Sequence, residues 1–330
     1  MFCGGLRMLR SSARSRRDRG PLPRSHRPSS HAVRLSLLCA PALVFLVLAS
    51  AVFAREVIDQ TGRRVDIPDH PRRIVSLAPS ITETLYALGL ADRLVGDTDY
   101  CDYPREARAK PHVGAMLNPN LEKIVALKPD LVLGTDEANR RETADQLARL
   151  GIPLYGLTAH TLDGTLTSIE DLGRTLGSEQ STEKLVARLR ERVEAVERRV
   201  QGQSRPKVLF VVWYRPLITA GKQTFIRDVI RRAGGISIGD DLIGEWPHMS
   251  VEEVLKRNPD VILFPKTEAF APGLEEFQRL PGWRELPAVK SHRMCFVSET
   301  IMRPSPRLVD ALEDLVDILH PETRLPAKEP

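Results

Sequence analysis

Two glutamates in a repeated segment are the residues best placed to act on another molecule. The stretch 120–133 (NLEKIVALKPDLVL) recurs as 250–263 (SVEEVLKRNPDVIL), and Glu122 and Glu252 hold the same position in each copy. Both fall in the first turn of a predicted helix, where the helix dipole favours a carboxylate by about 0.3–1 kcal/mol. The dipole explains one glutamate better than a matched pair, so helix capping and docking to a two-sided partner both stay open.

Aromatic side chains mark the loops that follow predicted strands. Tyr100 comes after 94–96, Trp213 and Tyr214 come after 208–212, and Trp246 precedes the second copy of the repeat. Aromatic rings give large, rigid contact area, which suits a large planar or partly apolar ligand. The alternative is that rings fill gaps in the core, and for Trp283 this is the preferred interpretation.

No residue pattern predicts catalysis or a metal bound by the protein itself. Histidines such as His112, His160, His248, His292 and His320 are scattered, and the chain lacks H-E-x-x-H, C-x-x-C, G-x-S-x-G and a phosphate-binding glycine loop. We therefore expect no enzyme activity and no cofactor. A secreted metalloenzyme or hydrolase, and a sensor domain of a membrane receptor, remain alternatives of other classes.

The charge of the chain is concentrated at its start. The net charge is +5 over 330 residues, but residues 1–54 contain nine Arg, no Lys and one acid, Asp18, which makes +8. The remainder carries 5 − 8 = −3, with both signs mixed. Residues 55–330 therefore do not predict binding to nucleic acid.

The first 54 residues have the pattern of an export signal. An arginine-rich stretch precedes the apolar run 35–48, which is short for a membrane span. Val52 and Ala54 place small residues at −3 and −1, so we expect cleavage after Ala54 and a periplasmic protein. Cleavage after Ala51 and an uncleaved anchor are the alternatives.

Two cysteines follow that leader, Cys101 and Cys295, one in each half of the chain. Export would permit a disulfide, but a bridge between the halves would lock them together. We therefore expect two separate thiols and a monomer.

The first half alternates strands and helices. Residues 55–71 predict an extended lead-in, and the patterns that follow predict strands at 73–78, 94–96, 131–134 and 153–157 and helices at 81–88, 121–128 and 141–150. This alternation is typical of parallel βαβ units. It predicts an N-terminal α/β lobe over 55–160.

The middle of the chain predicts one long connecting helix. Residues 165–201 are nearly all helical in pattern, and 181–200 contain neither Gly nor Pro. We assign 161–205 to this helical linker and 206–330 to a second α/β lobe. In that lobe we expect strands at 208–212, 261–264 and 294–297 and helices at 224–233, 251–257, 274–280 and 306–319. The predicted fold is thus α/β: two Rossmann-like lobes joined by one long rigid helix, with a ligand cleft between them.

Four motifs together resemble a known family. They are 74–83 (IVSLAPSITE), 100–104 (YCDYP), the first copy of the repeat over 120–130, and Arg303 with 305–307 (SPR). Over roughly residues 72–320 the chain resembles the periplasmic cobalamin-binding proteins of ABC importers. Their wider family of metal-chelate receptors also serves haem and ferric siderophores.

The resemblance implies roles for single residues. It implies two lobes with little hinge closure, a corrin-contacting Tyr100, a cleft Trp246, and Glu299 and Arg303 as acidic and basic positions of a ligand-facing loop. It also implies that Glu122 and Glu252 pair with arginines of the two permease subunits. The family's ligand-facing rings are replaced at three positions, by Met116, Thr135 and Ile218.

These observations predict an exported solute-binding protein that captures cobalamin or a related cobalt corrinoid. Its partners would be the permease dimer and the ATPase of an ABC importer. A haem or siderophore receptor is the alternative, with Tyr100, Met302 or His248 as possible axial ligands of haem. The predicted ligand-binding residues are Tyr100, Met116, Trp213, Tyr214, Ile218, Trp246, Glu299 and Arg303.

Overall fold

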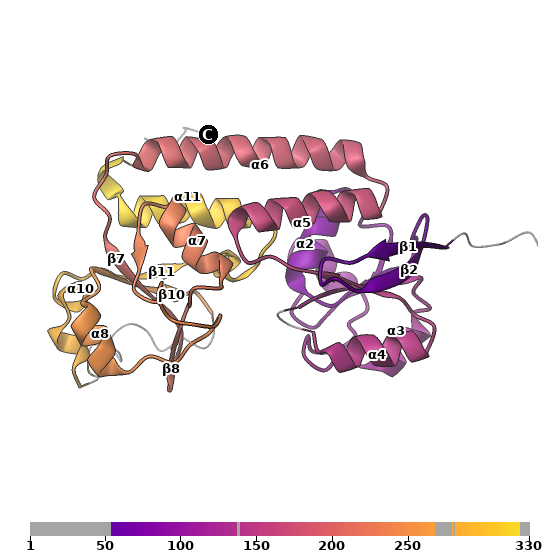
Figure 1. Cartoon of the computed structure of the whole chain (residues 1–330), viewed down its shortest axis with the longest axis horizontal. Coiled ribbons are helices and arrows are strands. Elements are labelled where there is room, and N and C mark those ends of the chain that lie inside the picture. Colours follow the sequence, from indigo (N-terminus) through magenta and orange to yellow (C-terminus); the bar gives the residue numbers. More distant parts are fainter. Residues whose placement is uncertain (1–53, 137–138, 268–278, 280, 324–330) are drawn as a thin grey trace, which may run out of the picture. The chain divides into compact units, whose positions relative to one another are not determined.

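The computed structural model describes residues 54–136, 139–267, 279 and 281–323 (Figure 1). The predicted leader lies outside these residues, except for Ala54, and so does the predicted helix 274–280, except for Arg279. Residues 52–330 form one compact unit. Within the described part of the chain, no helix combines the length and apolarity needed to cross a membrane.

The first sheet has four parallel strands in the order β4-β3-β5-β6. An antiparallel pair, β1 (Ala54–Ile58) and β2 (Arg64–Pro68), precedes it. The sheet strands are β3 (Ile74–Ser76), β4 (Leu94–Gly96), β5 (Leu131–Thr135) and β6 (Leu154–Leu157). The helices between them are α2 (Pro79–Ala87), η1 (Arg105–Ala109), α3 (Leu121–Ala126) and α4 (Arg141–Arg149). The predicted alternation of strands and helices is confirmed.

The second sheet has the order β11-β10-β7-β8, with the short strand β9 also paired to β7. Its strands are β7 (Lys207–Tyr214), β8 (Leu217–Thr219), β9 (Ile236–Ser237), β10 (Val261–Pro265) and β11 (Met294–Val297). The helices are α7 (Phe225–Arg232), α8 (Val251–Arg257), η3 (Trp283–Glu285), α10 (Pro287–Lys290), η4 (Glu299–Met302), α11 (Leu308–Leu319) and η5 (Pro321–Thr323).

The prediction that Trp213 and Tyr214 follow a strand as a loop is wrong. Strand β7 continues through both residues and turns at 215–216 into the antiparallel strand β8, so that Trp213 lies opposite Ile218. β-Branched and aromatic residues fit a pleated strand, and the unbroken run from Val208 to Tyr214 sustains one.

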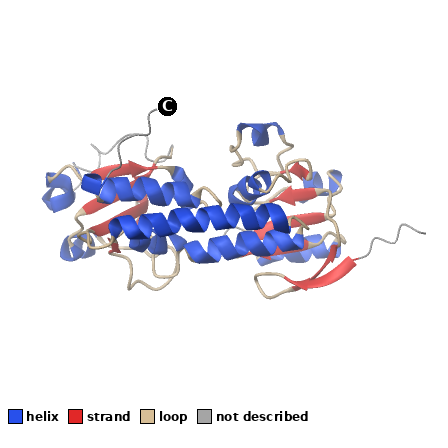
Figure 2. Ribbon diagram, turned by 90° about the horizontal axis from the view of Figure 1, so that it is seen from above, coloured by secondary structure: helices blue, strands red, loops and turns tan. Residues whose placement is uncertain are grey.

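The helical pattern predicted over 165–201 is confirmed, but it contains a second helix besides the long connecting one. Two helices, α5 (Leu162–Thr175) and α6 (Glu179–Val200), occupy this region. Gly177, at φ +66°, ends the first helix, because glycine adopts a left-handed conformation without steric cost. Helix α5 and α6 pack closely, since a Cβ on Gly173 would lie 2.1 Å from the hydroxyl of Thr182. Figure 2 shows these long helices side by side with α11.

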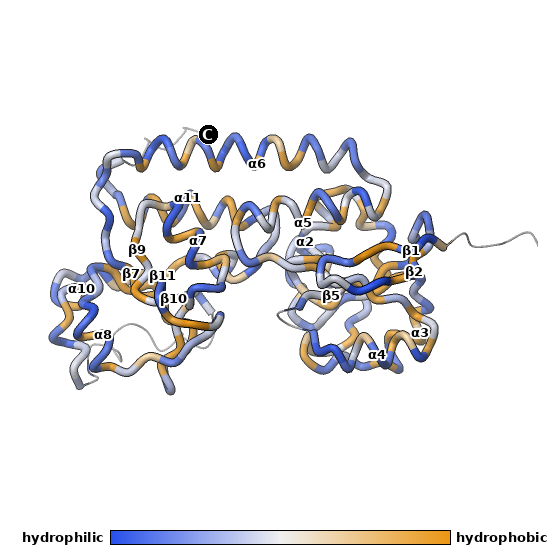
Figure 3. The backbone as a smooth tube through the Cα atoms, viewed as in Figure 1, coloured by the Kyte–Doolittle hydropathy of each residue, from blue (hydrophilic) through white to orange (hydrophobic). Residues whose placement is uncertain are grey.

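The largest hydrophobic core is shared by both sheets. It joins Leu133 of the first sheet and Leu263 of the second through Leu189 of α6 and Leu312 of α11. Apolar and hydrophilic residues alternate along α6 (Figure 3), as expected for a helix with one buried face. The sequence predicted two separate lobes, but among the described residues the clusters confined to one sheet are the two smaller ones. The core position expected for Trp283 is confirmed, since 2 % of it is exposed.

Candidate functional site

The carboxyl ends of the two sheets face each other across two contacts. After β4 and β11, the carboxylate of Asp102 accepts a hydrogen bond of 2.6 Å from Arg303. After β6, His160 lies 3.5 Å from a carboxylate oxygen of Glu245, which precedes α8. Open α/β sheets bind ligands at the carboxyl ends of their strands. These facing edges are therefore the candidate ligand site.

The β7–β8 hairpin presents two aromatic rings on the second sheet. Trp213 is 43 % exposed, and its indole N–H donates to the carbonyl of Arg215 over 2.9 Å. The ring of Tyr214 lies 6.1 Å from that of Trp213 and packs partly against the core beneath. Ile218 is partly buried and forms a bridge with His248.

Trp246 lies in a loop that runs along β8. The N–H of Gly221 donates to the carbonyl of Glu245 over 2.8 Å, and the N–H of Thr219 donates to that of Pro247 over 3.1 Å. These bonds flank Trp246, which is partly buried against the shared core. The hairpin and this loop therefore bring the predicted aromatic residues of the second lobe onto neighbouring segments.

The first sheet contributes Tyr100 and Met116. Tyr100 follows β4 and is 54 % exposed. Met116 is partly buried against the shared core, and its carbonyl accepts a bond of 2.8 Å from the side-chain amide of Asn139. The side-chain oxygen of Asn139, Oδ1, accepts a hydrogen bond of 2.7 Å from the backbone N–H of Thr135. Asn139 thus ties together two positions where this chain lacks a ring of the resembled family.

Arg303 is held by three carboxylates rather than left open to solvent. It donates to Glu83 over 2.9 Å and to Glu299 over 2.9 Å, besides Asp102. Burial alone would lower the pKa of Arg303, but the hydrogen bonds to Asp102 and Glu83 raise it above its ordinary value. Burial likewise opposes ionisation of Asp102, yet the bond to Arg303 holds its pKa below the usual range.

Glu83, in α2, is the buried centre of this inter-sheet cluster. Its side chain is 1 % exposed and accepts bonds from the hydroxyl of Ser305 over 2.6 Å and from Arg307 over 3.3 Å. The guanidinium of Arg307 also lies 3.7 Å from the ring centroid of Tyr103, within the range of a cation–π contact. The three carboxylates outnumber the two guanidinium groups, so the cluster has a formal charge of −1.

This cluster was not predicted from the sequence, although Glu299 and Arg303 were predicted as ligand-facing residues. Glu83 and Ser305 are 222 positions apart, and no local spacing reveals such a pair. The only signal was that Glu83 and the segment 305–307 belong to the motifs that carry the family resemblance.

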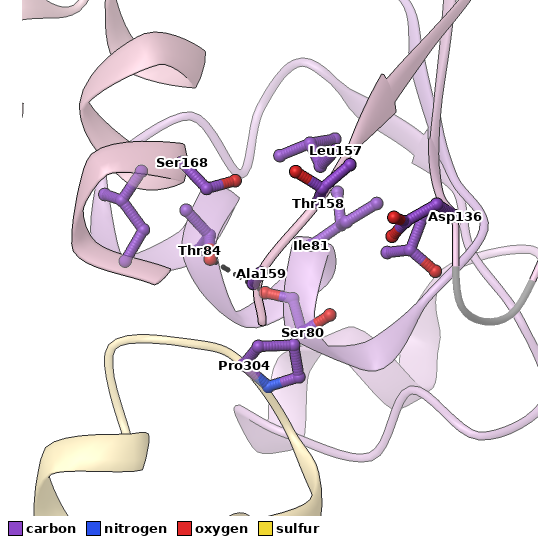
Figure 4. Close-up of a pocket in the computed structure, with 11 residues that line it drawn as sticks. Ser80, Ile81, Thr84, Asp136, Leu157, Thr158, Ala159, Ser168 and Pro304 are labelled. Atoms are coloured by element: carbon purple, nitrogen blue, oxygen red, sulfur yellow. Dashed lines mark hydrogen bonds between the residues drawn. The ribbon is translucent and has the colours of Figure 1, made fainter. Parts of the chain in front are cut away.

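A small pocket lies beside the cluster, where a loop of the second lobe approaches the first sheet (Figure 4). Pro304 comes from the second lobe, while hydroxyl groups of the first lobe provide most of the polar lining, together with Asp136. The hydroxyl of Thr84 donates to the carbonyl of Ser80 over 2.8 Å. Thr135 also lines this pocket, whose empty space is about 380 Å³.

The two thiols are separate in the structure. Cys101 is buried next to the hydroxyls of Thr82 and Thr98, both at 3.2 Å, and Cys295 is half-buried. Burial raises the pKa of both thiols. In the residues that the structure describes, no group of three His, Cys, Asp or Glu side chains is arranged to hold a metal ion.

The repeated glutamates lie on exposed helix starts. Asn120 caps α3 by accepting the N–H of Lys123 over 2.9 Å, and Ser250 caps α8 by accepting that of Glu253 over 3.1 Å. Ser250 and Glu253 have the spacing of a capping box, but only half of it forms, because the Glu253 carboxylate pairs with Arg257 at 2.5 Å. Glu122 and Glu252 themselves are exposed.

A family model described as "Periplasmic binding protein" matches residues 74–299. The chain belongs to the periplasmic binding protein family. That match includes both sheets and the facing strand ends.

Relatives of this family cover most of the chain. An uncharacterised ABC transporter substrate-binding lipoprotein, YvrC of Bacillus subtilis, is 33 % identical over 82 % of this chain and 87 % of its own. A vitamin B12-binding protein of Yersinia pestis is 32 % identical over 74 % of this chain and 84 % of its own.

A solved structure shares the arrangement. The periplasmic haem-binding protein RhuT from Roseiflexus sp. RS-1, in apo form, superposes with a TM-score of 0.70 at 29 % identity. The superposition covers 77 % of this chain and 99 % of RhuT. A protein named for vitamin B12 and a protein named for haem are thus both similar to this chain.

Proposed function

We propose that this protein is the solute-binding component of an ABC importer and that its cargo is cobalamin or a related cobalt corrinoid. The protein would capture the corrinoid between the facing sheet ends and deliver it to the permease dimer and its ATPase. Support comes from the family, from the vitamin B12-binding relative and from the rings of Tyr100 and Trp213 at the strand ends. Binding alone accounts for this role, without covalent chemistry.

The charge of the inter-sheet cluster is the observation that favours a corrinoid. Haem carries two propionates and many siderophores are polyanions, so either ligand calls for basic groups that are free to pair with it. Arg303 and Arg307 already bond to carboxylates of the protein, and the cluster is net negative. Corrinoids carry neutral carboxamides along their edge, which can accept and donate hydrogen bonds without such groups.

The possible axial ligands of haem add little to the alternative. Met302 packs partly against the shared core, and His248 is exposed in the bridge to Ile218. Tyr100 is exposed and suits stacking on a planar ligand as well as it suits a metal.

Delivery to the membrane would depend on the repeated glutamates. Glu122 and Glu252 would pair with basic side chains of the two permease subunits, and such exposed pairs weaken as salt is added. This role places the protein in the periplasm, after removal of the predicted signal peptide near Ala54.

Titration with three ligands tests the cargo. Residues 55–330 are purified, mixed with cyanocobalamin, cobinamide or haemin, and followed by visible spectroscopy and calorimetry. We expect a corrinoid to bind with a Kd between nanomolar and just below micromolar, about −8 to −12 kcal/mol. Replacing Trp213 by Ala should weaken that binding about tenfold through lost ring contact.

Binding of haemin that is tighter than binding of either corrinoid would contradict the proposed cargo and leave the alternative receptor. Binding of none of the three would contradict both. Trp213→Ala is matched by Ile236→Ala, because Ile236 is also 43 % exposed but lies in β9 opposite Lys207 at the start of β7, away from the strand ends that form the candidate site. This change should leave affinity unchanged.

A further inference from the structure

The two copies of the repeat share a second exposed residue besides the glutamate. Val125 and Leu255 lie three residues after Glu122 and Glu252, on the same side of their helices. They are 42 % and 37 % exposed, whereas the neighbouring residues Ile124 and Val254 are fully buried. Each copy therefore presents a carboxylate with an aliphatic side chain one turn away.

The backbone holds both copies in the same way. Each helix runs into a residue with positive φ, Lys128 at 47° and Asn258 at 53°. An aspartate then anchors the turn to the first strand of its own sheet: Asp130 accepts the N–H of Arg73 over 2.9 Å, and Asp260 accepts that of Lys207 over 2.7 Å. The two exposed pairs thus have equivalent orientations relative to their sheets.

Residues that differ between the copies bond inside the protein. Lys123 donates to the carbonyl of His112 over 3.2 Å, while its counterpart Glu253 pairs with Arg257. The residues that match face outward instead, and within the described part of the chain no ion pair involves Glu122 or Glu252. The helix dipole explains the glutamates. Leu255 is packed in part, because its Cδ1 lies 3.3 Å from the position of a Cβ on Gly282, but more than a third of it is exposed, as is Val125 at the matching position.

We propose that Val125 and Leu255 form the apolar half of the surface that docks on the importer. This inference rests on the proposed function, and it adds to the glutamates a second type of contact. The partner that fits is a permease with two equivalent surfaces, each with a basic side chain beside an apolar recess. Burial of the aliphatic groups provides attraction that salt does not screen, next to ion pairs that salt weakens.

Binding to the cognate permease–ATPase complex in lipid nanodiscs tests the proposal by surface plasmon resonance. Val125→Gln and Leu255→Gln place a good helix former at both positions and remove the aliphatic surface. We expect each variant to raise the docking Kd about 3–10-fold and the pair about 10–100-fold. The salt dependence of docking and the affinity for cyanocobalamin should stay as in the wild type.

Leu150→Gln is the matched control, because Leu150 is 54 % exposed and lies outside the repeat. It should dock like the wild type. The charge-reversal variant Glu122→Arg/Glu252→Arg should abolish docking and spare ligand binding.

The outcomes distinguish the proposed apolar contact from the proposed docking through the glutamates. If charge reversal abolishes docking but the Gln pair docks normally, the apolar contact is wrong and the glutamate docking stands. If neither variant changes docking, the docking surface itself is wrong. If the Gln pair changes self-association in light scattering and leaves docking unchanged, the surface binds a second copy of this chain, which also overturns the proposal.

Discussion

Asp97 is a buried carboxylate whose two oxygens have different surroundings. One oxygen pairs with Nδ1 of His112 at 2.7 Å, and the other has no hydrogen-bond partner among the described residues. Burial raises the pKa of Asp97 to about 6 from the ordinary 3.8, although His112 and Lys110 partly oppose this. The residue begins the loop that bears Tyr100, so its protonation acts next to the candidate ligand site.

Asp97→Asn tests this assignment through the pH dependence of stability. The folded protein holds the Asp97 proton more tightly than the unfolded chain, so the stabilising contribution is full below about pH 3.8 and is lost as pH rises through about 6. Asn cannot ionise. The unfolding free energy of the variant minus that of the wild type should therefore grow by up to roughly 3 kcal/mol between pH 4 and 7.

Urea unfolding at several pH values measures this difference. The control is Asp92→Asn, which removes an exposed carboxylate just before β4 and should give no such trend. A constant difference for Asp97→Asn across the range would mean that the carboxyl keeps its ordinary pKa in the folded state.

The sequence predicted whether single residues are exposed or buried, but it did not predict which residues they bond to. The exposure expected of a binding ring holds for Tyr100 and Trp213, and the core position expected of Trp283 is correct. By contrast, Glu299 and Arg303 were expected to face a ligand; in the structure they bond to each other, and Arg303 also bonds to Glu83. Charge complementarity between distant segments depends on the finished fold, so it is invisible in a sequence read locally.

The repeated helix–turn–strand unit is the element that the sequence predicts best. Helix α8 begins and ends at the predicted residues, and strands β5 and β10 begin at the predicted residues and end one residue later. The predicted ends of helices and strands were wrong where a single local residue type overrode a longer hydrophobic pattern. Gly177 interrupts the helical run, and the aromatic end of β7 extends a strand that apolar patterning alone had ended at Val212.

The positive φ shared by Lys128 and Asn258 gives a prediction at the level of the element. A left-handed conformation costs an ordinary L-residue about 1–2 kcal/mol, but Asn adopts it more readily. Lys128→Asn should therefore stabilise the protein by about 0.5 kcal/mol, and Asn258→Lys should destabilise it by a similar amount. The bond from Arg73 to residue 128 uses the backbone carbonyl and survives the change.

Thermal and urea unfolding of the two reciprocal variants measure these effects. The two variants are controls for each other, because they exchange the same side chains at matched positions. A loss of stability in Lys128→Asn would show that the lysine side chain contributes more than its backbone strain costs.

At the scale of the whole molecule, two features unite the sheets: the shared core and the charge cluster around Glu83. The core crosses α6 and α11, and the cluster joins α2 to the loop after β11. The sequence indicated two lobes and a connector, and it could not show that their apolar faces merge, because periodicity identifies a buried face without its partner.

A double-mutant cycle on Glu83 and Arg303 measures the coupling across this junction. Both side chains are largely buried, at 1 % and 14 % exposure, and removal of one partner leaves an uncompensated charge. We expect Glu83→Gln and Arg303→Gln to be non-additive in unfolding free energy by about 1–3 kcal/mol.

The matched control is the surface pair Glu56 and Arg64, whose side chains are 55 % and 73 % exposed at a distance of 2.7 Å. Its coupling should stay below about 1 kcal/mol. Additive effects for Glu83 and Arg303 would mean that the cluster contributes no stability beyond that of its separate members.

Helix α6 lies between the two sheets in chain order, and this order determines which helices each fragment keeps if the backbone is cut. A break in the turn at 202–205 would leave α6 attached to the first sheet and α11 attached to the second. The first fragment would keep the contact between α5 and α6, but each fragment would expose the leucine and valine side chains of α6 or α11 that pack against the other fragment. The halves of this protein are therefore complementary pieces of one folding unit, and neither is an independent receptor.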